Sequence, residues 1–129
     1  MIVRKITEIS NHPERDVHSS MWNSKRLLLA RDGMGFSLHV TVVYAGSEVK
    51  MHYKNHLEAV YCIEGRGTVE DLGENKTHLI TPGTVYALNL NDRHILRPET
   101  DMRFVCVFNP PVAGDETHDA DGAYPAFPG

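Results

Sequence analysis

A polar cluster stands where an apolar run begins, in residues 51–67, MHYKNHLEAVYCIEGRG. It brings His52, Tyr53, His56 and Glu58 close together along the chain. Imidazole and carboxylate groups transfer protons near neutral pH, and both also bind metal ions. The segment therefore predicts acid–base chemistry or a metal site at the end of a β-strand.

The spacing from Gly46 through His52, Lys54 and Glu58 to Gly65 resembles the first motif of the cupin superfamily. In that motif two histidines and a glutamate converge on a metal inside a jelly-roll barrel. Lys54 replaces one of the histidines, and a protonated ammonium group offers no lone pair to a metal. One interpretation is therefore a cupin that has lost its metal.

A second cupin motif places a metal-binding histidine shortly after a turn like Pro82-Gly83, and here that position is Tyr86. If alternate residues of the apolar runs face the barrel interior, Glu58, Tyr86 and His94 can meet there. A carboxylate oxygen, a phenolate oxygen and an imidazole nitrogen leave open positions on a metal. That set suits iron(II) or another first-row divalent metal.

Short strand-like runs separated by turns must position these residues. We expect strands at residues 2–6, 26–30, 35–44, 58–63, 68–72, 77–80, 84–89, 94–97 and 102–108. No segment carries a sustained helical stripe, and at most one or two helical turns fit between residues 10 and 24. The pattern predicts a single all-β domain over residues 1–129, built as an antiparallel sandwich or closed barrel that can hold one small ligand.

Composition excludes several classes of partner. The chain has 129 residues, with 17 acidic against 13 basic side chains and a formal net charge of −4. It has no run of Lys or Arg, so neither nucleic acid nor an anionic membrane surface is an expected partner. The chain shows no secretory signal and no stretch long enough to span a bilayer, which predicts a cytoplasmic protein. Cys62 and Cys106 lie in apolar runs and are expected to be reduced and buried.

Four longer segments narrow the resemblance. They are WNSKRLLLARDGMGFS (22–37), HYKNHLEAVYCIEGRG (52–67), ITPGTVYALNLNDRH (80–94) and MRFVCVFNPPVAGDETHDADGAYP (102–125). Together they resemble the ectoine synthase family, and the similarity runs from Met1 to about Pro125. The resemblance implies a cupin-type jelly-roll barrel, usually a head-to-tail homodimer. It implies closure of N-γ-acetyl-L-2,4-diaminobutyrate to ectoine, a compatible solute that protects bacteria in salt, and Fe²⁺ bound by Glu58, Tyr86 and His94.

The implied ring closure sets three chemical tasks. The amide carbonyl must be polarised, the α-amine must lose its proton, and the leaving oxygen must be protonated. A metal with open positions can act on the carbonyl as a Lewis acid, and side chains near neutrality can move the protons. The barrel must also fold an open-chain substrate so that amine and carbonyl touch. No redox change is needed.

The resemblance also assigns roles to residues, beside simpler interpretations. Tyr53 and His56 are expected to move protons or to support Glu58, and Glu116 and His118 complete the catalytic set. Arg26 is expected to bind the substrate carboxylate, with a surface salt bridge as the alternative. His39 stands where asparagine is frequent in the family, and Cys106 and Phe108 are expected either in the pocket or as core filling. The predicted substrate-binding residues are Trp22, Ser24, Arg26, His39, Thr41, Cys106 and Phe108.

Residues 112–129 are rich in turn formers and follow the last expected strand. They are expected to form a lid over the barrel mouth, with a frayed terminus as the alternative. Two other functions fit a cupin barrel. One is an iron(II) dioxygenase, which typically uses three histidines, and the other is a non-catalytic barrel that binds a small molecule.

Overall fold

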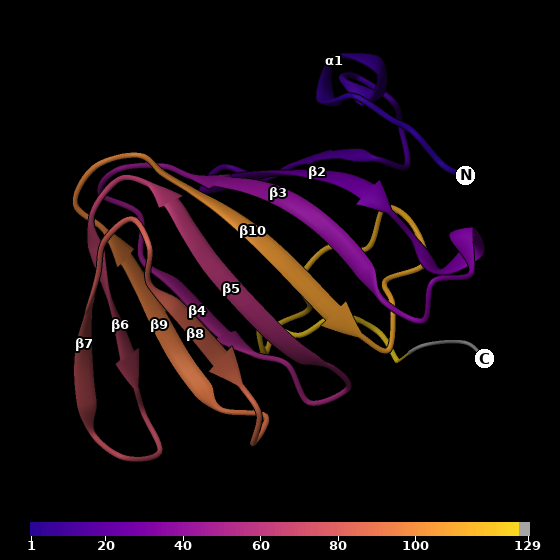
Figure 1. Ribbon diagram of the computed structural model, residues 1–129. Coiled ribbons are helices and arrows are strands. Elements are labelled where there is room, and N and C mark those ends of the chain that lie inside the picture. Colours follow the sequence, from indigo (N-terminus) through magenta and orange to yellow (C-terminus); the bar gives the residue numbers. More distant parts are fainter. Residues whose placement is uncertain (127–129) are drawn as a thin grey trace.

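The structure is a computed structural model that describes residues 1–126, and it consists of two antiparallel β-sheets facing each other (Figure 1). The larger sheet has six strands in the order β1-β2-β3-β10-β5-β8, and the smaller has four in the order β4-β9-β6-β7. The elements are α1 (Ile6–Ile9), β1 (Asp16–His18), β2 (Trp22–Leu28), the 3₁₀ turn η1 (Ala30–Asp32), β3 (Ser37–Val43), β4 (Val49–His52), β5 (Leu57–Glu64), β6 (Gly67–Asp71), β7 (Lys76–Ile80), β8 (Val85–Leu88), β9 (Arg93–Pro98) and β10 (Met102–Asn109).

The strand pairs are nested as in one long hairpin wound around a barrel. The hairpin β6–β7 lies at its tip, and β5–β8, β4–β9 and β3–β10 pair in turn behind it. Successive pairs alternate between the two sheets, because β4–β9 and β6–β7 belong to the smaller one. This connectivity is a jelly roll, so the all-β barrel prediction is confirmed.

The inner face of the larger sheet is partly polar. On β3 the buried side chains are Ser37, His39 and Val43, while Val40 between them is only partly buried. On β5 the alternation buries Glu58, Val60 and Cys62 and exposes the residues between them. Polar groups on the buried face of a sheet cost free energy unless they bind something, so this face carries the candidate site.

One close turn depends on glycine. Gly65, between β5 and β6, has a positive φ of 90°, and a Cβ built on it would lie 2.2 Å from the carbonyl oxygen of Asp101. Any larger residue would push the β5–β6 turn away from the connection between β9 and β10. The GRG sequence after the EAVYCI run is therefore a structural requirement of the barrel.

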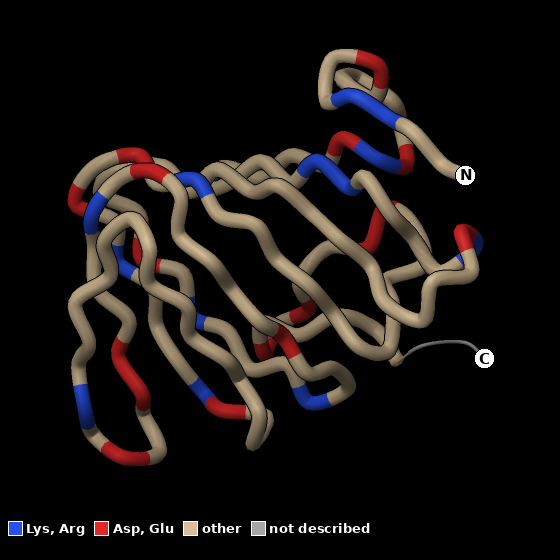
Figure 2. Tube along the Cα trace, in the orientation of Figure 1, with Lys and Arg blue, Asp and Glu red and all other residues tan. Residues whose placement is uncertain are grey.

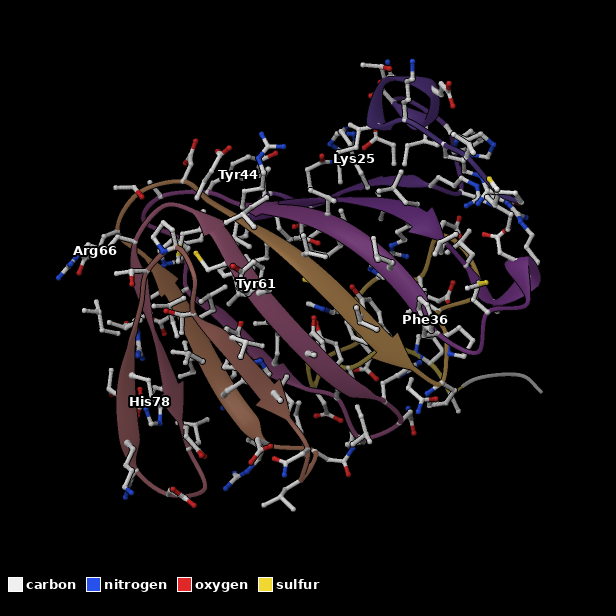
Figure 3. All side chains as sticks on the ribbon, in the orientation of Figure 1. Lys25, Phe36, Tyr44, Tyr61, Arg66 and His78 are labelled. Carbon is white, nitrogen blue, oxygen red and sulfur yellow. The ribbon has the colours of Figure 1, made fainter. Side chains whose placement is uncertain are left out.

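Many of the charged residues lie in the turns and near the ends of strands (Figure 2). The middle of the β3–β10–β5 layer carries none. Side chains such as Tyr61, labelled in Figure 3, therefore form an apolar outer face on the larger sheet. Cys62 and Cys106 are free and buried, as expected. Within residues 1–126, no helix is long and apolar enough to cross a membrane.

The N-terminal part differs from expectation. The strand predicted at residues 2–6 is wrong: Ile2 and Val3 are exposed, and α1 begins at Ile6, with the Glu8 carboxylate accepting the Lys5 N–H at 3.0 Å. The helical turn therefore precedes residues 10–24, and β1 lies inside that range. The strand predicted at 26–30 is displaced, since β2 covers 22–28. The short strand β4 was not expected.

Candidate functional site

A cavity lies between the two sheets, and most of the predicted site residues line it. Its walls come from β2, β3, β4, β5, β8, β9 and β10 and from the C-terminal tail. The barrel thus brings together side chains that lie far apart in the sequence. The predicted residues that line the cavity are Trp22, Ser24, His39, Thr41, Tyr53, Glu58, Tyr86, Cys106, Phe108 and His118.

Glu58 is a buried carboxyl in this cavity. Burial raises the pKa of Glu58 to about 8, although a hydrogen bond with Cys106 opposes the shift. Tyr86 on the neighbouring strand β8 pairs with Val60, the next residue of β5 that shares a face with Glu58. Burial and the nearby Glu58 raise the pKa of the Tyr86 phenol well above 10. The raised pKa values keep both groups protonated near neutral pH, and a bound cation would favour their charged forms, which are the forms that bind a metal.

His94 supplies a free nitrogen beside them. Its Nδ1 donates a hydrogen bond to the Asp92 carbonyl oxygen at 2.9 Å, which leaves the Nε2 lone pair available. Nε2 is buried, and no hydrogen-bond partner for it exists within residues 1–126. The His94 and Tyr86 ring centroids are 6.3 Å apart. Burial lowers the pKa of His94, so the imidazole is neutral and able to bind a metal.

The donor set of Glu58, Tyr86 and His94 therefore fits a first-row divalent metal. In the described part of the chain, no group of three or more His, Cys, Asp and Glu side chains could hold a metal ion.

Arg26 is a buried cation without an acidic partner among residues 1–126. It is 0% exposed, and its guanidinium donates to the Gly114 carbonyl oxygen at 2.7 Å, to the Tyr124 hydroxyl at 3.3 Å and to Ser24 Oγ at 3.3 Å. All three acceptors are neutral. The predicted alternative, a surface salt bridge, is therefore wrong. A buried guanidinium of this kind is stabilised by an anion that enters the site.

A chain of hydrogen bonds links Arg26, through Ser24, His39 and Ser37, to the beginning of the tail. His39 lies 3.4 Å from Ser24 Oγ through Nδ1 and 3.2 Å from Ser37 Oγ through Nε2. Ser37 Oγ in turn accepts the N–H of Val112 at 3.0 Å. Burial, with the charges of Arg26 and His56, holds the pKa of His39 well below 6.5, so the ring is neutral. The histidine thus connects β2, β3 and the tail.

The tail covers the cavity on one side. His118 lies 2.7 Å from the Tyr53 hydroxyl through Nε2, and its ring packs 5.4 Å from that of Trp22. Burial and the charge of Arg26 lower the pKa of His118 to about 4. Asn55 then donates to the Tyr124 carbonyl oxygen at 2.9 Å, and His52 N–H donates to that of Gly122 at 3.1 Å. Residues 112–126 are thus docked on the barrel, while residues 127–129 of the predicted lid lie outside the described part.

Two predicted catalytic residues lie beside the cavity and do not line it. The Glu116 carboxylate accepts the N–H groups of Ala113 at 2.7 Å and Gly114 at 2.6 Å, so it shapes the turn that offers its carbonyl to Arg26. His56 is buried against Phe108 and Tyr124, and neither of its ring nitrogens has a hydrogen-bond partner in the described residues. Burial lowers the pKa of His56.

Tyr124, Asn55 and Gly122 also contribute to the site and were not predicted from the sequence. Tyr124 lines the cavity, and the Arg26 guanidinium lies 5.3 Å from its ring centroid. The signal was present in the segment DGAYP, where an aromatic residue follows a turn in an otherwise polar tail. Nothing in the sequence alone indicated that this tail returns to β4.

Comparisons with known proteins decide the family. The family described as ectoine synthase matches residues 1–128. The chain belongs to the ectoine synthase family. It is 57% identical to the L-ectoine synthase of Sphingopyxis alaskensis over 128 residues, which are 99% of this chain and 93% of the relative. The crystal structure of ectoine synthase from P. lautus superposes with a TM-score of 0.84 at 52% identity, over 88% of this chain and 80% of that one.

A more distant structure shares the fold alone. A predicted oxalate decarboxylase from Thermotoga maritima has a TM-score of 0.65 at 21% identity and covers 85% of this chain and 99% of its own. The barrel of this ectoine synthase family member is thus found in proteins of different sequence. The predicted cupin-type jelly roll is confirmed.

Proposed function

We propose that this protein closes N-γ-acetyl-L-2,4-diaminobutyrate into ectoine with loss of water. The observation that carries the proposal is the match to the ectoine synthase family over residues 1–128. The α-amine nitrogen attacks the acetamide carbon and forms the ring C–N bond. The amine gives up two protons, and the carbonyl oxygen leaves with them as water, so no electrons are exchanged. Family membership thus favours a lyase over a dioxygenase or a non-catalytic barrel.

Substrate binding begins with Arg26. Its buried guanidinium has only neutral partners among the described residues, and it can form a bidentate pair with the substrate carboxylate. Arg26 itself does not line the central cavity, but its hydrogen-bond partner Tyr124 does. The rings of Tyr124, Trp22 and Phe108 can enclose the methylene groups of the substrate. Holding the carboxylate at one end and folding the chain against these rings brings amine and carbonyl together.

The metal belongs to the proposal. Glu58, Tyr86 and His94 would hold a first-row divalent ion such as Fe²⁺, which supplies Lewis-acid polarisation of the amide oxygen when bound. Cys106 and Thr41 line the cavity near Glu58, and their side chains contact each other at 3.9 Å. Their place in the cavity suits them to exclude water from the reacting carbonyl.

Proton transfer is assigned to Tyr53 and His118. Burial, followed by nearby Tyr124 and Glu58, raises the pKa of Tyr53 well above 10, so the phenol keeps its proton, and the lowered pKa of His118 makes its ring neutral at pH 7. The two groups, 2.7 Å apart, can pass a proton between the substrate and the imidazole. His56 and Glu116 support this pair by shaping the tail and the wall behind Phe108.

The tail acts as a lid that shields the reaction from water. The family resemblance favours a homodimer, a cytoplasmic location and a role in osmotic stress. Exposed apolar side chains on the outer face of the larger sheet, such as Val85 at 61% exposure, are compatible with an interface. Analytical ultracentrifugation measures the oligomeric state.

The decisive experiment is incubation of anaerobically purified, Fe²⁺-loaded protein with the acetylated diaminobutyrate. Mass spectrometry should show a product lighter than the substrate by the mass of one water, and an oxygen electrode should record no consumption. Unchanged substrate under metal-replete, saline conditions would contradict the proposed function. Product formation that requires oxygen would favour the dioxygenase.

A further inference from the structure

A second hollow opens in the side of the barrel, away from the tail. It lies between β7, the last strand of the smaller sheet, and β8, the last strand of the larger one. The β6–β7 hairpin forms one wall and the β8–β9 loop the other. The polar residues that line it are Asp71, Glu74, His78, Asn89, Asp92 and His94.

The hollow reaches two of the three candidate metal ligands, Tyr86 and His94, while Glu58 lines the central cavity. Tyr86 lines both the hollow and the central cavity, so its ring separates the two. His94 lines the hollow with its Nδ1 used by Asp92, so Nε2, buried and without a partner within residues 1–126, is the nitrogen left. Asp71 is the direct cross-strand partner of His94 and marks the path toward it.

The walls of the hollow are acidic. Asp71, Glu74 and Asp92 line it, and Figure 2 shows acidic segments at the lower end of the β6–β7 hairpin. His78, labelled on β7 in Figure 3, is exposed. Together with the three carboxylates and His94, it gives the hollow five side chains of types that bind metals. Lys76 is the cross-strand partner of Asp71, and its Nζ lies 3.8 Å from the Glu74 carboxylate. Both side chains of this ion pair are mainly exposed, so the pair is weak.

The tail side of the cavity has the opposite character. Arg26 places a buried positive charge there, and Tyr53, His118, Tyr124 and Trp22 close that side with packed rings. A divalent cation approaching from the tail side would meet both a steric and an electrostatic barrier, whereas an organic carboxylate would be attracted.

We propose that the hollow between β7 and β8 is the passage by which a divalent metal ion reaches Glu58, Tyr86 and His94, while the organic substrate uses the tail side. The inference rests on the proposed metal site. Asp71 and Glu74 attract the hydrated ion, and His78 and Asp92 line the path to His94 Nε2. Separate passages allow the metal to be exchanged while the tail remains docked.

The test measures the rate of metal uptake. Metal-free protein is mixed with Co²⁺ in a stopped-flow instrument, and quenching of the single tryptophan, Trp22 in the central cavity, reports binding. The double variant Asp71→Asn/Glu74→Gln removes two negative charges, and the new amide at position 71 keeps an oxygen that can accept the N–H groups of residues 73 and 74. The matched control, Asp115→Asn/Asp121→Asn, removes two charges from the exposed tail.

We expect the hollow variant to take up Co²⁺ about tenfold more slowly at low salt, with a weaker dependence on salt. Its final metal content, measured by elemental analysis, should equal that of the wild type. The tail variant should match the wild type in both. Equal uptake rates in the hollow variant and the wild type, or slower uptake only in the tail variant, would overturn the passage and leave the metal site intact. A wild type that binds no metal would overturn the metal site and the passage together.

Discussion

Tyr86 occupies the position on β8 from which its side chain faces both Glu58 across the strand pair and His94 across the barrel. Replacement by Phe keeps the ring and removes the oxygen. We therefore expect Tyr86→Phe to lower the affinity for Fe²⁺ or Co²⁺ by about tenfold or more, while the melting temperature of the metal-free protein stays the same. Titration of metal-free protein by calorimetry measures the affinity.

The exposed Tyr61 on the outer face of β5 provides the control for this change. Tyr61→Phe also removes a phenol oxygen, and it should leave the metal affinity unchanged. A full metal affinity in Tyr86→Phe would mean that the triad is assigned wrongly, and the Tyr53 oxygen would then be the one to examine.

Arg26 gives a second prediction at the residue scale. Arg26→Met keeps a similar length and removes the charge, so the substrate carboxylate loses its partner. We expect KM to rise by about tenfold to a hundredfold, which corresponds to the loss of a charge-assisted hydrogen-bonding pair. Steady-state kinetics with the metal-loaded protein measure this.

The free energy of unfolding of Arg26→Met gives a second test of this assignment, independent of KM. A buried charge without an acidic partner is itself destabilising. The free energy of unfolding should therefore fall less in Arg26→Met than it would if a buried ion pair had been broken. Arg103→Met on β10, where the side chain is 39% exposed, is the matched control and should retain the wild-type KM. A normal KM in Arg26→Met would contradict the carboxylate assignment.

At the scale of the elements, strong period-two alternation allowed most of the barrel to be predicted. The runs around Glu58 and Cys106 alternate cleanly because one face is buried, and the structure places strands there within one residue of expectation. Residues 2–6 contain β-branched side chains, but no strand in the described part of the chain pairs with them, so composition alone was misleading. The strand β4 was missed because it has only four residues, with Lys50 between the buried Val49 and Met51.

The candidate site was predictable only in part. The residue types of Glu58 and Tyr86 and their positions on inward strand faces indicated the site, because polar side chains on a buried face lie close to each other. The contacts of the tail were not predictable, because they depend on long-range pairs such as Asn55 with Tyr124, separated by 69 residues. No local pattern records such a contact.

The docking of the tail depends on Gly122. Its φ is 74°, and an added Cβ would lie 2.3 Å from the Lys50 carbonyl oxygen of β4. We expect Gly122→Ala to undock residues 115–126, with faster hydrogen exchange there and kcat reduced about tenfold or more, since His118 leaves Tyr53. The barrel strands should exchange as slowly as in the wild type.

Gly83→Ala provides the control for this backbone change. Gly83 also has a positive φ, of 92°, but apart from its chain neighbours no atom of residues 1–126 lies within 4 Å of its added Cβ. It should therefore share the conformational cost and keep the tail docked. Wild-type kcat in Gly122→Ala, with the tail demonstrably released by hydrogen exchange, would show that the tail has no part in the reaction.

At the scale of the whole molecule, the two aspartates Asp16 and Asp32 join the N-terminal segment to the barrel. Asp32 pairs with Arg4 at 2.8 Å and with the buried Arg15 at 3.4 Å, and it accepts the Leu29 N–H at 2.9 Å. Asp16 accepts hydrogen bonds from Asn11 N–H at 2.6 Å and from Asn23 at 2.7 Å. These contacts stabilise the charged form of both carboxyls only in the folded state.

The resulting pH dependence has a definite sign. Burial alone would raise the pKa of Asp32, but hydrogen bonds from Arg4 and Leu29 and the charges of Arg15 and Arg4 outweigh it and lower the pKa to about 2, from 3.8. The unfolded chain therefore binds the proton more tightly than the folded one. The contribution to stability is complete above about pH 4 and is lost as the pH falls toward 2.

We therefore expect Asp32→Asn to reduce the free energy of unfolding at pH 7 by about 2 kcal/mol. The difference from the wild type should shrink steadily between pH 4 and pH 2, because the wild type itself then loses the charge. Urea unfolding at a series of pH values measures both. Asp115→Asn, at an exposed position of the tail, is the matched control and should follow the wild type throughout. A difference between Asp32→Asn and the wild type that stays constant down to pH 2 would mean that Asp32 stabilises the fold through packing and not through its charge, and the ion pairs with Arg4 and Arg15 would then contribute little to holding the N-terminal segment on the barrel.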